Sequence, residues 1–317
     1  MKSCEILGWT VDLSLGIIRP NDKAIRKLMW AFFMVDNKAS KWPLQQCQML
    51  ASLAERYSLA LRGMTHFVYP FHAMCGKYGL DPKASSNRQL WRAVSSQVKF
   101  SVEMWRMVAI SLYCDPLSLA MPIASLVRPI YSLPDYFLIT DAGPLKLGYA
   151  IHNSEGVLLW YSSYTWPFVR NDNFQNAKEF LAFLVVLVEL LNSGLVPDCC
   201  TIHWTGDNTS SLIWVQENRC KSIFTQRAFF VFSLLCLRRR ISVCDVVHRP
   251  GDLMGAIDAL SRDKMHDLNP HLFKDVQHPA IVDALLHLCD PILIQSATLD
   301  DHHLALVKVF DVVGAMS

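Results

Sequence analysis

The chain has 317 residues, of which 52% are apolar and 18% charged, and its formal net charge is +2. This composition excludes an intrinsically disordered chain, and any charged binding surface has to be local because the charges nearly cancel. The ten cysteines show no C-x-x-C spacing, which argues against a zinc site or a disulfide framework and favours an intracellular, cytoplasmic or nuclear location. The most apolar run, 180–191, is shorter than the roughly 20 residues that span a bilayer, so we expect no membrane partner.

The N-terminal stretch predicts a β-hairpin. Ile6 to Val11 alternates apolar and polar residues, and Gly16 to Ile18 resumes the pattern after a turn. A hairpin alone is only marginally stable in water. We therefore expect another chain to cover it, or the sequence to be part of something longer.

Helical periodicity dominates the following hundred residues. It predicts helices from Asn21, from Pro43, over 57–78 and over 87–112, with a turn-rich connection at 78–86. Several prolines between 115 and 134 then interrupt regular structure, and they predict a domain boundary there.

Short β-type runs mark the second half of the chain. The predicted elements, in order, are strands over 136–141, 147–152 and 157–163, a helix over 175–192, a strand over 200–205, helices from Asp207 and over 225–238, a strand over 241–247 and a short closing helix. This order predicts an α/β fold in which helices flank a mixed five-stranded sheet.

Four carboxylates stand at the junctions of these predicted elements. Asp141 ends a strand, Glu179 lies in the first turns of a helix, Asp207 follows a strand and Asp258 opens the closing helix. Hard carboxylate oxygens on rigid elements suit Mg²⁺, and like charges gathered at one point require a cation. If the four converge, they form a metal-dependent nuclease site that holds two ions.

Four segments resemble the ribonuclease H domain of retrotransposon reverse transcriptases. They are Thr140–Gly148, Ala177–Phe180, Gly206–Thr209 and His248–Arg262, and the last, with its His-x-Pro-Gly and Asp-Ala-Leu-Ser-Arg pieces, is the most specific. The Asp-Asn-Thr at 207–209 looks closest to elements that also encode a tyrosine recombinase. The resemblance implies a ribonuclease H-like fold.

The resemblance also implies a function. It makes Asp141, Glu179, Asp207 and Asp258 the ligands of two Mg²⁺ ions, for which Mn²⁺ can substitute, and it gives His248 a part in proton transfer or product release. The implied enzyme is an endonuclease that cuts the RNA strand of an RNA–DNA hybrid and leaves a 3′-hydroxyl. An integrase-like or resolvase-like nuclease is less favoured, because such sites lack the His-x-Pro-Gly ending.

Upstream similarity is weaker and suggests four parts. Residues 1–42 resemble the end of a polymerase palm, with its hairpin and a first helix, and 43–128 resemble a helical thumb and connection. Residues 129–265 form the ribonuclease H-like part, and 266–317 are expected to be a helical tail of unknown role.

Departures from the family pattern leave a second hypothesis open. Gly143 replaces a usual Ser, Lys146 a usual Gly and Met254 a usual Asn, and no aromatic-x-Asp-Asp hairpin precedes Leu7. We therefore expect no polymerase activity from this chain alone, and a separate palm and fingers chain is a candidate partner. The alternative function is that of a catalytically inactive retroelement remnant acting, if at all, as a nucleic-acid-binding module.

Overall fold

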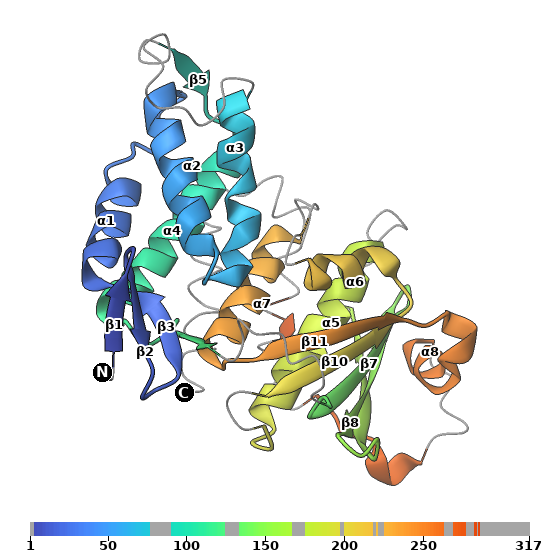
Figure 1. Cartoon of the computed structure of the whole chain (residues 1–317). Helices are drawn as coiled ribbons and strands as arrows, with labels where there is room; N and C mark the ends of the chain where they lie inside the picture. The colour runs from blue at the N-terminus through green and yellow to red at the C-terminus, as the bar shows by residue number, and fades with distance from the viewer. Residues whose placement is uncertain are drawn as a thin grey trace. The chain divides into compact units, whose positions relative to one another are not determined.

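A computed structural model describes residues 3–76, 90–123, 133–166, 175–196, 200–217, 220, 225–262, 269–276, 282–283 and 285. The chain divides into two compact units, Met1–Val127 (unit 1) and Arg128–Ser317 (unit 2) (Figure 1). No helix in these described ranges has both the length and the apolar character needed to cross a membrane. The expected turn at 78–86 and most of the expected tail helix lie outside the described residues.

Unit 1 opens with a small antiparallel sheet. Its strand order is β1-β2-β3-β6, and the strands are β1 (Ser3–Ile6), β2 (Trp9–Asp12), β3 (Ile17–Pro20) and β6 (Met121–Pro122). The predicted strand over 6–11 is wrong, because Leu7 and Gly8 have φ angles of 50° and 91° and form the turn between β1 and β2. The hairpin also has a partner strand within this chain, since β6 pairs with β3. The expectation that it needs cover from another chain therefore loses its basis.

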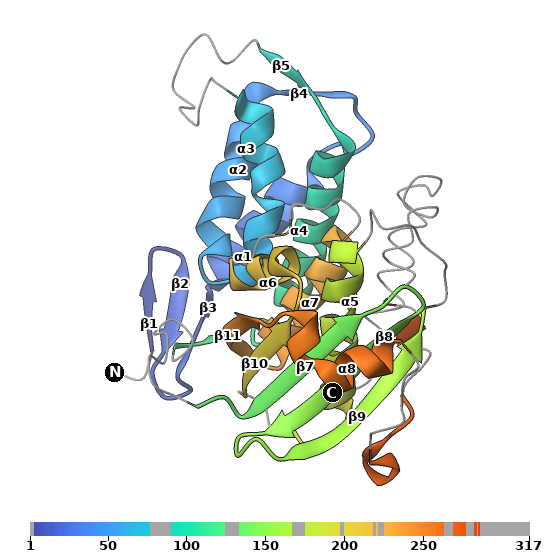
Figure 2. The same cartoon turned by 90° about the vertical axis from the view of Figure 1, so that its right-hand side faces the viewer.

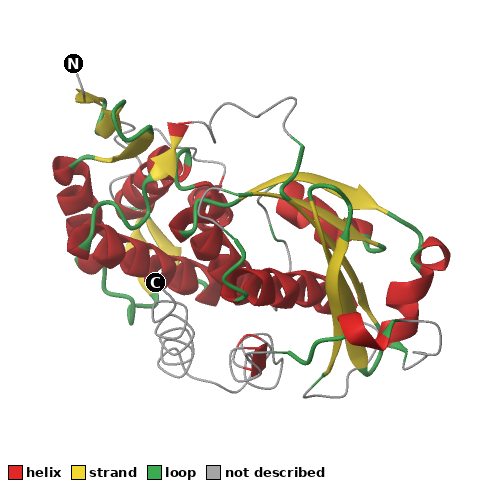
Figure 3. Cartoon of the chain, turned by 90° about the horizontal axis from the view of Figure 1, so that it is seen from below, coloured by secondary structure: helices red, strands yellow, loops and turns green. Residues whose placement is uncertain are grey.

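The rest of unit 1 is mostly helical, as the colours of Figure 3 show. Its helices are α1 (Asp22–Phe33), α2 (Leu44–Ser58), the 3₁₀ helix η1 (Arg62–Phe67), α3 (Tyr69–Cys75) and α4 (Ser96–Cys114). Phe32 of α1 stacks on Trp105 of α4 with ring centroids 5.5 Å apart, and both side chains are fully buried. The apolar residues that α4 buries, among them Val98, Val102 and Trp105, therefore form a core face of unit 1.

Two predicted helices of unit 1 begin later than expected. The stretch 57–78 contains η1 before α3, and Pro70 stands in the first turn of α3, where its missing N–H costs nothing. In the stretch 87–112, β5 (Trp91–Ala93) pairs antiparallel with β4 (Lys41–Pro43), and α4 starts only after Ser95, whose hydroxyl accepts from the amide of Val98.

Unit 2 contains the predicted mixed five-stranded sheet, and the α/β prediction is confirmed. The strand order is β11-β10-β7-β8-β9, with β10 parallel to both β7 and β11 and with β8 antiparallel to β7 and β9. The strands are β7 (Tyr136–Ala142), β8 (Lys146–Asn153), β9 (Leu158–Thr165), β10 (Thr201–Gly206) and β11 (Ser242–His248). Because β7 and β10 are parallel neighbours, their carboxyl ends meet at one edge of the sheet.

Helices cover both faces of this sheet. They are α5 (Gln175–Asn192), α6 (Thr209–Gln216), α7 (Gln226–Arg238), the 3₁₀ helix η6 (Gly251–Leu253), α8 (Gly255–Ser261) and the 3₁₀ helix η7 (Pro270–Leu272). On one face Phe183 of α5 stacks on Trp204 of β10 with ring centroids 4.2 Å apart. On the other face α8 packs over β7–β9 (Figure 2). There Leu260 joins Tyr161 and Ala150 in a buried cluster.

Candidate metal centre

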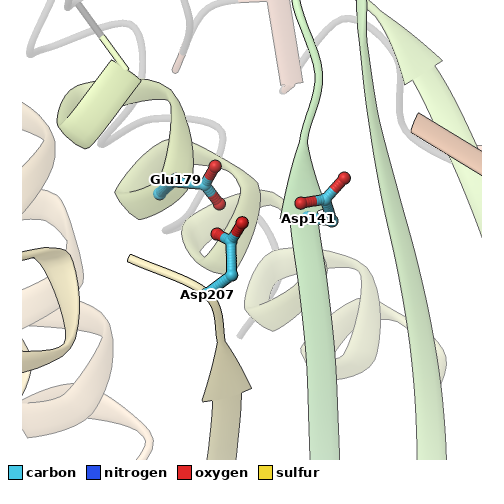
Figure 4. Close-up of side chains that lie close together, drawn as sticks. All are labelled: Asp141, Glu179 and Asp207. Carbon is cyan, nitrogen blue, oxygen red and sulfur yellow. The ribbon is translucent and has the colours of Figure 1, made fainter. Parts of the chain in front are cut away.

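Three of the four predicted carboxylates converge at the sheet edge where β7 and β10 end. Asp141 stands near the end of β7, Glu179 in the second turn of α5 and Asp207 directly after β10. One oxygen of each lies within 4.8 Å of the other two, and the three side chains point toward one another (Figure 4). Asp141 and Glu179 are buried, with exposed fractions of 5% and 2%.

Local hydrogen bonds fix the end of β10 beside the end of β7. Trp204 donates from its indole Nε1 to the hydroxyl of Thr140, which precedes Asp141, at 3.0 Å. Asn208 caps α6, because its Oδ1 accepts from the amide of Ser211 at 3.0 Å. Asp207, expected to open this helix, is thus held between a strand and a capped helix, and neither neighbour leaves it much freedom.

The carboxylate of Glu179 is held through one oxygen only. Gln175, one turn earlier on α5, donates from Nε2 to Glu179 Oε1 at 2.6 Å and also to the carbonyl of Ala142. The other oxygen, Oε2, is buried and has no hydrogen-bond partner among the described residues. An unpaired buried carboxylate oxygen is costly, and a bound cation is the partner that would satisfy it. The site therefore fits a metal ion.

Asp141 is also held through one oxygen. The hydroxyl of Ser261, at the end of α8, donates to Asp141 Oδ2. Since Asp141 lies on β7 and Ser261 on α8, this bond joins the sheet to the helix that carries Asp258.

Asp258, the fourth predicted ligand, lies close to the other three without joining the compact group. Its Oδ1 forms an ion pair with Nε of Arg262 at 2.7 Å, one helical turn further on. Its side chain is 28% exposed, and its charge still contributes to raising the pKa of Asp141 and of Asp207. The structure therefore brings three predicted ligands together and leaves the fourth beside them, paired with an arginine.

His248, at the end of β11, is next to Asp207 but touches its backbone rather than its carboxylate. Its ring Nε2 lies 2.9 Å from the carbonyl oxygen of Asp207, and because a carbonyl only accepts, Nε2 is the donor in this contact. The residue is exposed. His248 is thus placed at the rim of the carboxylate group, where solvent and a substrate can reach it.

The carboxylates are electrostatically strained as long as no cation neutralises them. Burial raises the pKa of Glu179 well above its usual range, and the charges of Asp207 and Asp141 raise it further. Burial is also the main cause that raises the pKa of Asp141 and the pKa of Asp207. Groups with raised pKa values in a cluster are typical of a functional site.

Close packing explains one departure from the family pattern. A Cβ atom at Gly143 would lie 2.6 Å from the backbone oxygen of Ser261, so the Ser that is usual there does not fit beside α8. Met254, another departure, is buried at the start of α8 with an exposed fraction of 4%.

Sequence reasoning missed Gln175 and Ser261. Gln175 stands four residues before Glu179, and this helical spacing is the signal that could have identified it. Ser261 contacts Asp141, which is 120 residues away, and no spacing in the sequence marks it.

Comparisons with known proteins gave matches only among solved structures. No protein-family model matches the chain, and no curated protein matches it either. An RNase H1 isolated from compost by a metagenomic approach is similar with 17% identity and a TM-score of 0.34, over 42% of this chain and 96% of that one. RNase H1 from the archaeon Halobacterium salinarum is similar with 17% identity and a TM-score of 0.31, over 42% of this chain and 97% of that one.

A viral protein matches over more of the chain. The foamy viral protease-reverse transcriptase, in a complex with an RNA/DNA hybrid, is similar with 12% identity and a TM-score of 0.25, over 78% of this chain. This chain spans only 30% of the length of that viral chain.

Proposed function

We propose that this chain is a metal-dependent endonuclease that cuts the RNA strand of an RNA–DNA hybrid. The observation that carries the proposal is the convergence of Asp141, Glu179 and Asp207 within 4.8 Å, two of them buried and one with an unpaired oxygen. Such a group is unfavourable without a cation. Its all-oxygen donor set favours Mg²⁺ or Mn²⁺ over metals that prefer nitrogen or sulfur.

The proposed ligand roles are those that the family resemblance implies. Asp141 would help to hold both ions, and Glu179 and Asp207 would complete the ligands of the first. Asp258 would help to hold the second ion. Its present partner Arg262 is more than half exposed, with a side-chain exposed fraction of 57%. When bound, two Mg²⁺ ions supply an activated water and stabilise the leaving oxygen, which then remains as a 3′-hydroxyl.

His248 is proposed to assist proton transfer or product release. It is exposed at the rim of the carboxylate group, and histidine is the side chain that most often transfers protons in enzyme active sites. Its Nε2 hydrogen bond to the carbonyl of Asp207 orients the ring.

The choice of substrate depends on the family resemblance of segments 140–148, 177–180, 206–209 and 248–262. An RNA–DNA hybrid is read through groove shape and through the 2′-hydroxyl, so no base-stacking platform is needed. The helical unit 1 is proposed to grip the hybrid, as a thumb does. The assignment to elements with a tyrosine recombinase, and a separate polymerase chain as partner, stay predictions.

The test is cleavage of a hybrid whose RNA strand is labelled, by purified full-length chain with Mg²⁺ or Mn²⁺. We expect the RNA strand to be cut, duplex DNA to stay intact and EDTA to stop the reaction. Asp141→Asn and Asp207→Asn should abolish cutting. Asp245→Asn, which changes an exposed carboxylate on β11 of the same sheet, is the matched control and should cut at the rate of the wild type.

Three results would contradict the proposal. A folded protein that binds the hybrid without cutting it would be the inactive remnant, a nucleic-acid-binding module. Cutting of duplex DNA at a similar rate would indicate a different nuclease on the same fold. Cutting that survives in both Asn variants would place the active site elsewhere.

A further inference from the structure

Helix α8 lies unusually close to the strand pair that carries Asp141. A Cβ atom at Gly148 would be 2.7 Å from the Cβ of Leu260 and 2.9 Å from the amide nitrogen of Ser261, and one at Gly143 would be 2.6 Å from the carbonyl oxygen of Ser261. Both distances to backbone atoms are shorter than real side chains allow. The absence of side chains at Gly143 and Gly148 therefore allows the backbone of Ser261 to pack against β7 and β8 beside Asp141.

The side chain of Ser261 points from there to Asp141. Its exposed fraction is 2%, and its Oγ contacts both Asp141 Oδ2 and, at 3.0 Å, the carbonyl oxygen of Asp258. A hydroxyl has one hydrogen, and a bond to a charged acceptor is the stronger of the two. The hydroxyl hydrogen therefore goes to the carboxylate of Asp141.

We propose that Ser261 is a positioning residue of the metal centre, whose hydroxyl occupies Oδ2 of Asp141 and thereby assigns Oδ1 to the metal ions. This inference depends on the proposed function. The neighbouring carboxylate of Glu179 is arranged in the same way. Gln175 donates to Oε1, and Oε2 has no hydrogen-bond partner among the described residues. In both cases a neutral donor orients the carboxylate without competing with a cation for the site.

The expected benefit is preorganisation. The terminal torsion of an aspartate is broad and roughly two-fold, so a free carboxylate presents either oxygen at many angles. Hydrogen-bond partners of metal ligands fix that torsion, and their removal typically weakens metal affinity about 10- to 100-fold. We expect Ser261→Ala to lie near the lower end of this range, because the carboxylate stays buried and charged.

The experiment measures Mn²⁺ binding to the full chain by the loss of the free-ion electron paramagnetic resonance signal. Ser261→Ala should weaken binding about tenfold, and Ser261→Thr, which keeps the hydroxyl, should restore affinity to within about threefold of the wild type. Ser233→Ala is the matched control. Ser233 is also 2% exposed, but its hydroxyl donates to the helical carbonyl of Phe229 at 2.8 Å, so its variant should bind Mn²⁺ as the wild type does.

Hybrid cleavage adds a second readout that a purely structural role would not move. In Ser261→Ala the Mg²⁺ concentration for half-maximal rate should rise about tenfold, and the rate at saturating Mg²⁺ should fall less than threefold. Unchanged Mn²⁺ affinity in Ser261→Ala would overturn the inference while leaving the proposed function intact. Equal binding by the wild type and by Asp141→Asn would overturn the proposed function and the inference together.

Discussion

Gly148 lies directly across the β7–β8 pair from Asp141, and the space that its side chain would fill is occupied by α8. Directly opposed residues in an antiparallel pair present their side chains to the same face. A glycine opposite Asp141 therefore allows a helix to approach the carboxylate from above. That helix carries Ser261, which bonds Asp141, and Asp258, the fourth predicted ligand.

This relationship predicts that Gly148→Ala is destabilising although the added group is a single methyl. The methyl would overlap with Leu260 and with the backbone of Ile257 and Ser261, and backbone cannot move aside as a flexible side chain can. Overpacking of this kind costs about 1–3 kcal/mol. Urea unfolding should show this loss, together with weaker Mn²⁺ binding because α8 is displaced.

Gly255→Ala is the matched control for that change. Gly255 is the first residue of the same helix, and a Cβ there would meet nothing within 4 Å. Its variant should unfold within about 0.5 kcal/mol of the wild type, as surface substitutions usually do. Equal losses of unfolding free energy in the two variants would mean that the close approach of α8 to β8 is not the reason why Gly148→Ala is destabilising.

The raised pKa of Glu179 predicts how stability depends on pH in the absence of metal. Above the ordinary pKa of 4.5 the unfolded chain releases this proton, whereas the folded chain keeps it until the raised pKa is reached. Over that window the native state binds more protons, so the free energy of unfolding decreases as the pH rises. Thermal melts in EDTA from pH 4 upward should show this decrease.

Glu179→Gln should remove this contribution, because glutamine does not ionise. At neutral pH without metal, the variant should melt higher than the wild type by about 2–4 °C for each kcal/mol gained. With Mg²⁺ the order should reverse, since only the wild type gains stability from binding. Glu189→Gln is the control on the same helix, and because Glu189 is buried outside the carboxylate group, its variant should keep the response to Mg²⁺. A loss of that response in both variants would contradict the assignment of the site.

Gln175→Met should reveal what the hydrogen bond from Gln175 contributes to holding the carboxylate of Glu179. The variant removes both hydrogen bonds of Nε2, leaving Glu179 Oε1 and the carbonyl of Ala142 without this donor. Unsatisfied buried acceptors cost about 1–3 kcal/mol each, and Mn²⁺ affinity should fall about tenfold because the carboxylate is no longer oriented. Gln226→Met, at the corresponding first position of α7, should leave Mn²⁺ affinity unchanged. A Gln175→Met protein with wild-type affinity would rule out orientation by Gln175.

Much of the sheet could be predicted because its strands and helices differ in local pattern. The helix predicted over 175–192 has the same bounds in the structure, since its apolar run is long and its end is marked by Ser193 and Gly194. The turn at Leu7 and Gly8 was missed because a leucine with positive φ is rare. Gly8, which interrupts the alternating pattern, was the signal in the sequence. Strand β5 was missed because 91–93 continue the apolar spacing of the helix that follows.

The convergence of the carboxylates could also be predicted, because each stands at the end of a predicted element and parallel neighbouring strands end at one edge of the sheet. The sequence pattern could not predict the hydrogen bonds between segments that are distant in the chain. The bonds from Ser261 to Asp141 and from Gln175 to Ala142 join residues 120 and 33 positions apart.

His248 provides a last prediction, because it separates catalysis from metal binding. Among the residues that the structure describes, its ring bonds the backbone carbonyl of Asp207 and no carboxylate oxygen, so His248→Ala should leave Mn²⁺ affinity within about twofold of the wild type. If the imidazole assists proton transfer, the rate of hybrid cleavage at saturating Mg²⁺ should fall about 100- to 10,000-fold. His271→Ala, which removes another exposed histidine of unit 2, should not change the rate. An unchanged rate in His248→Ala would remove His248 from the mechanism, and a loss of metal affinity would assign it a structural part in the site instead.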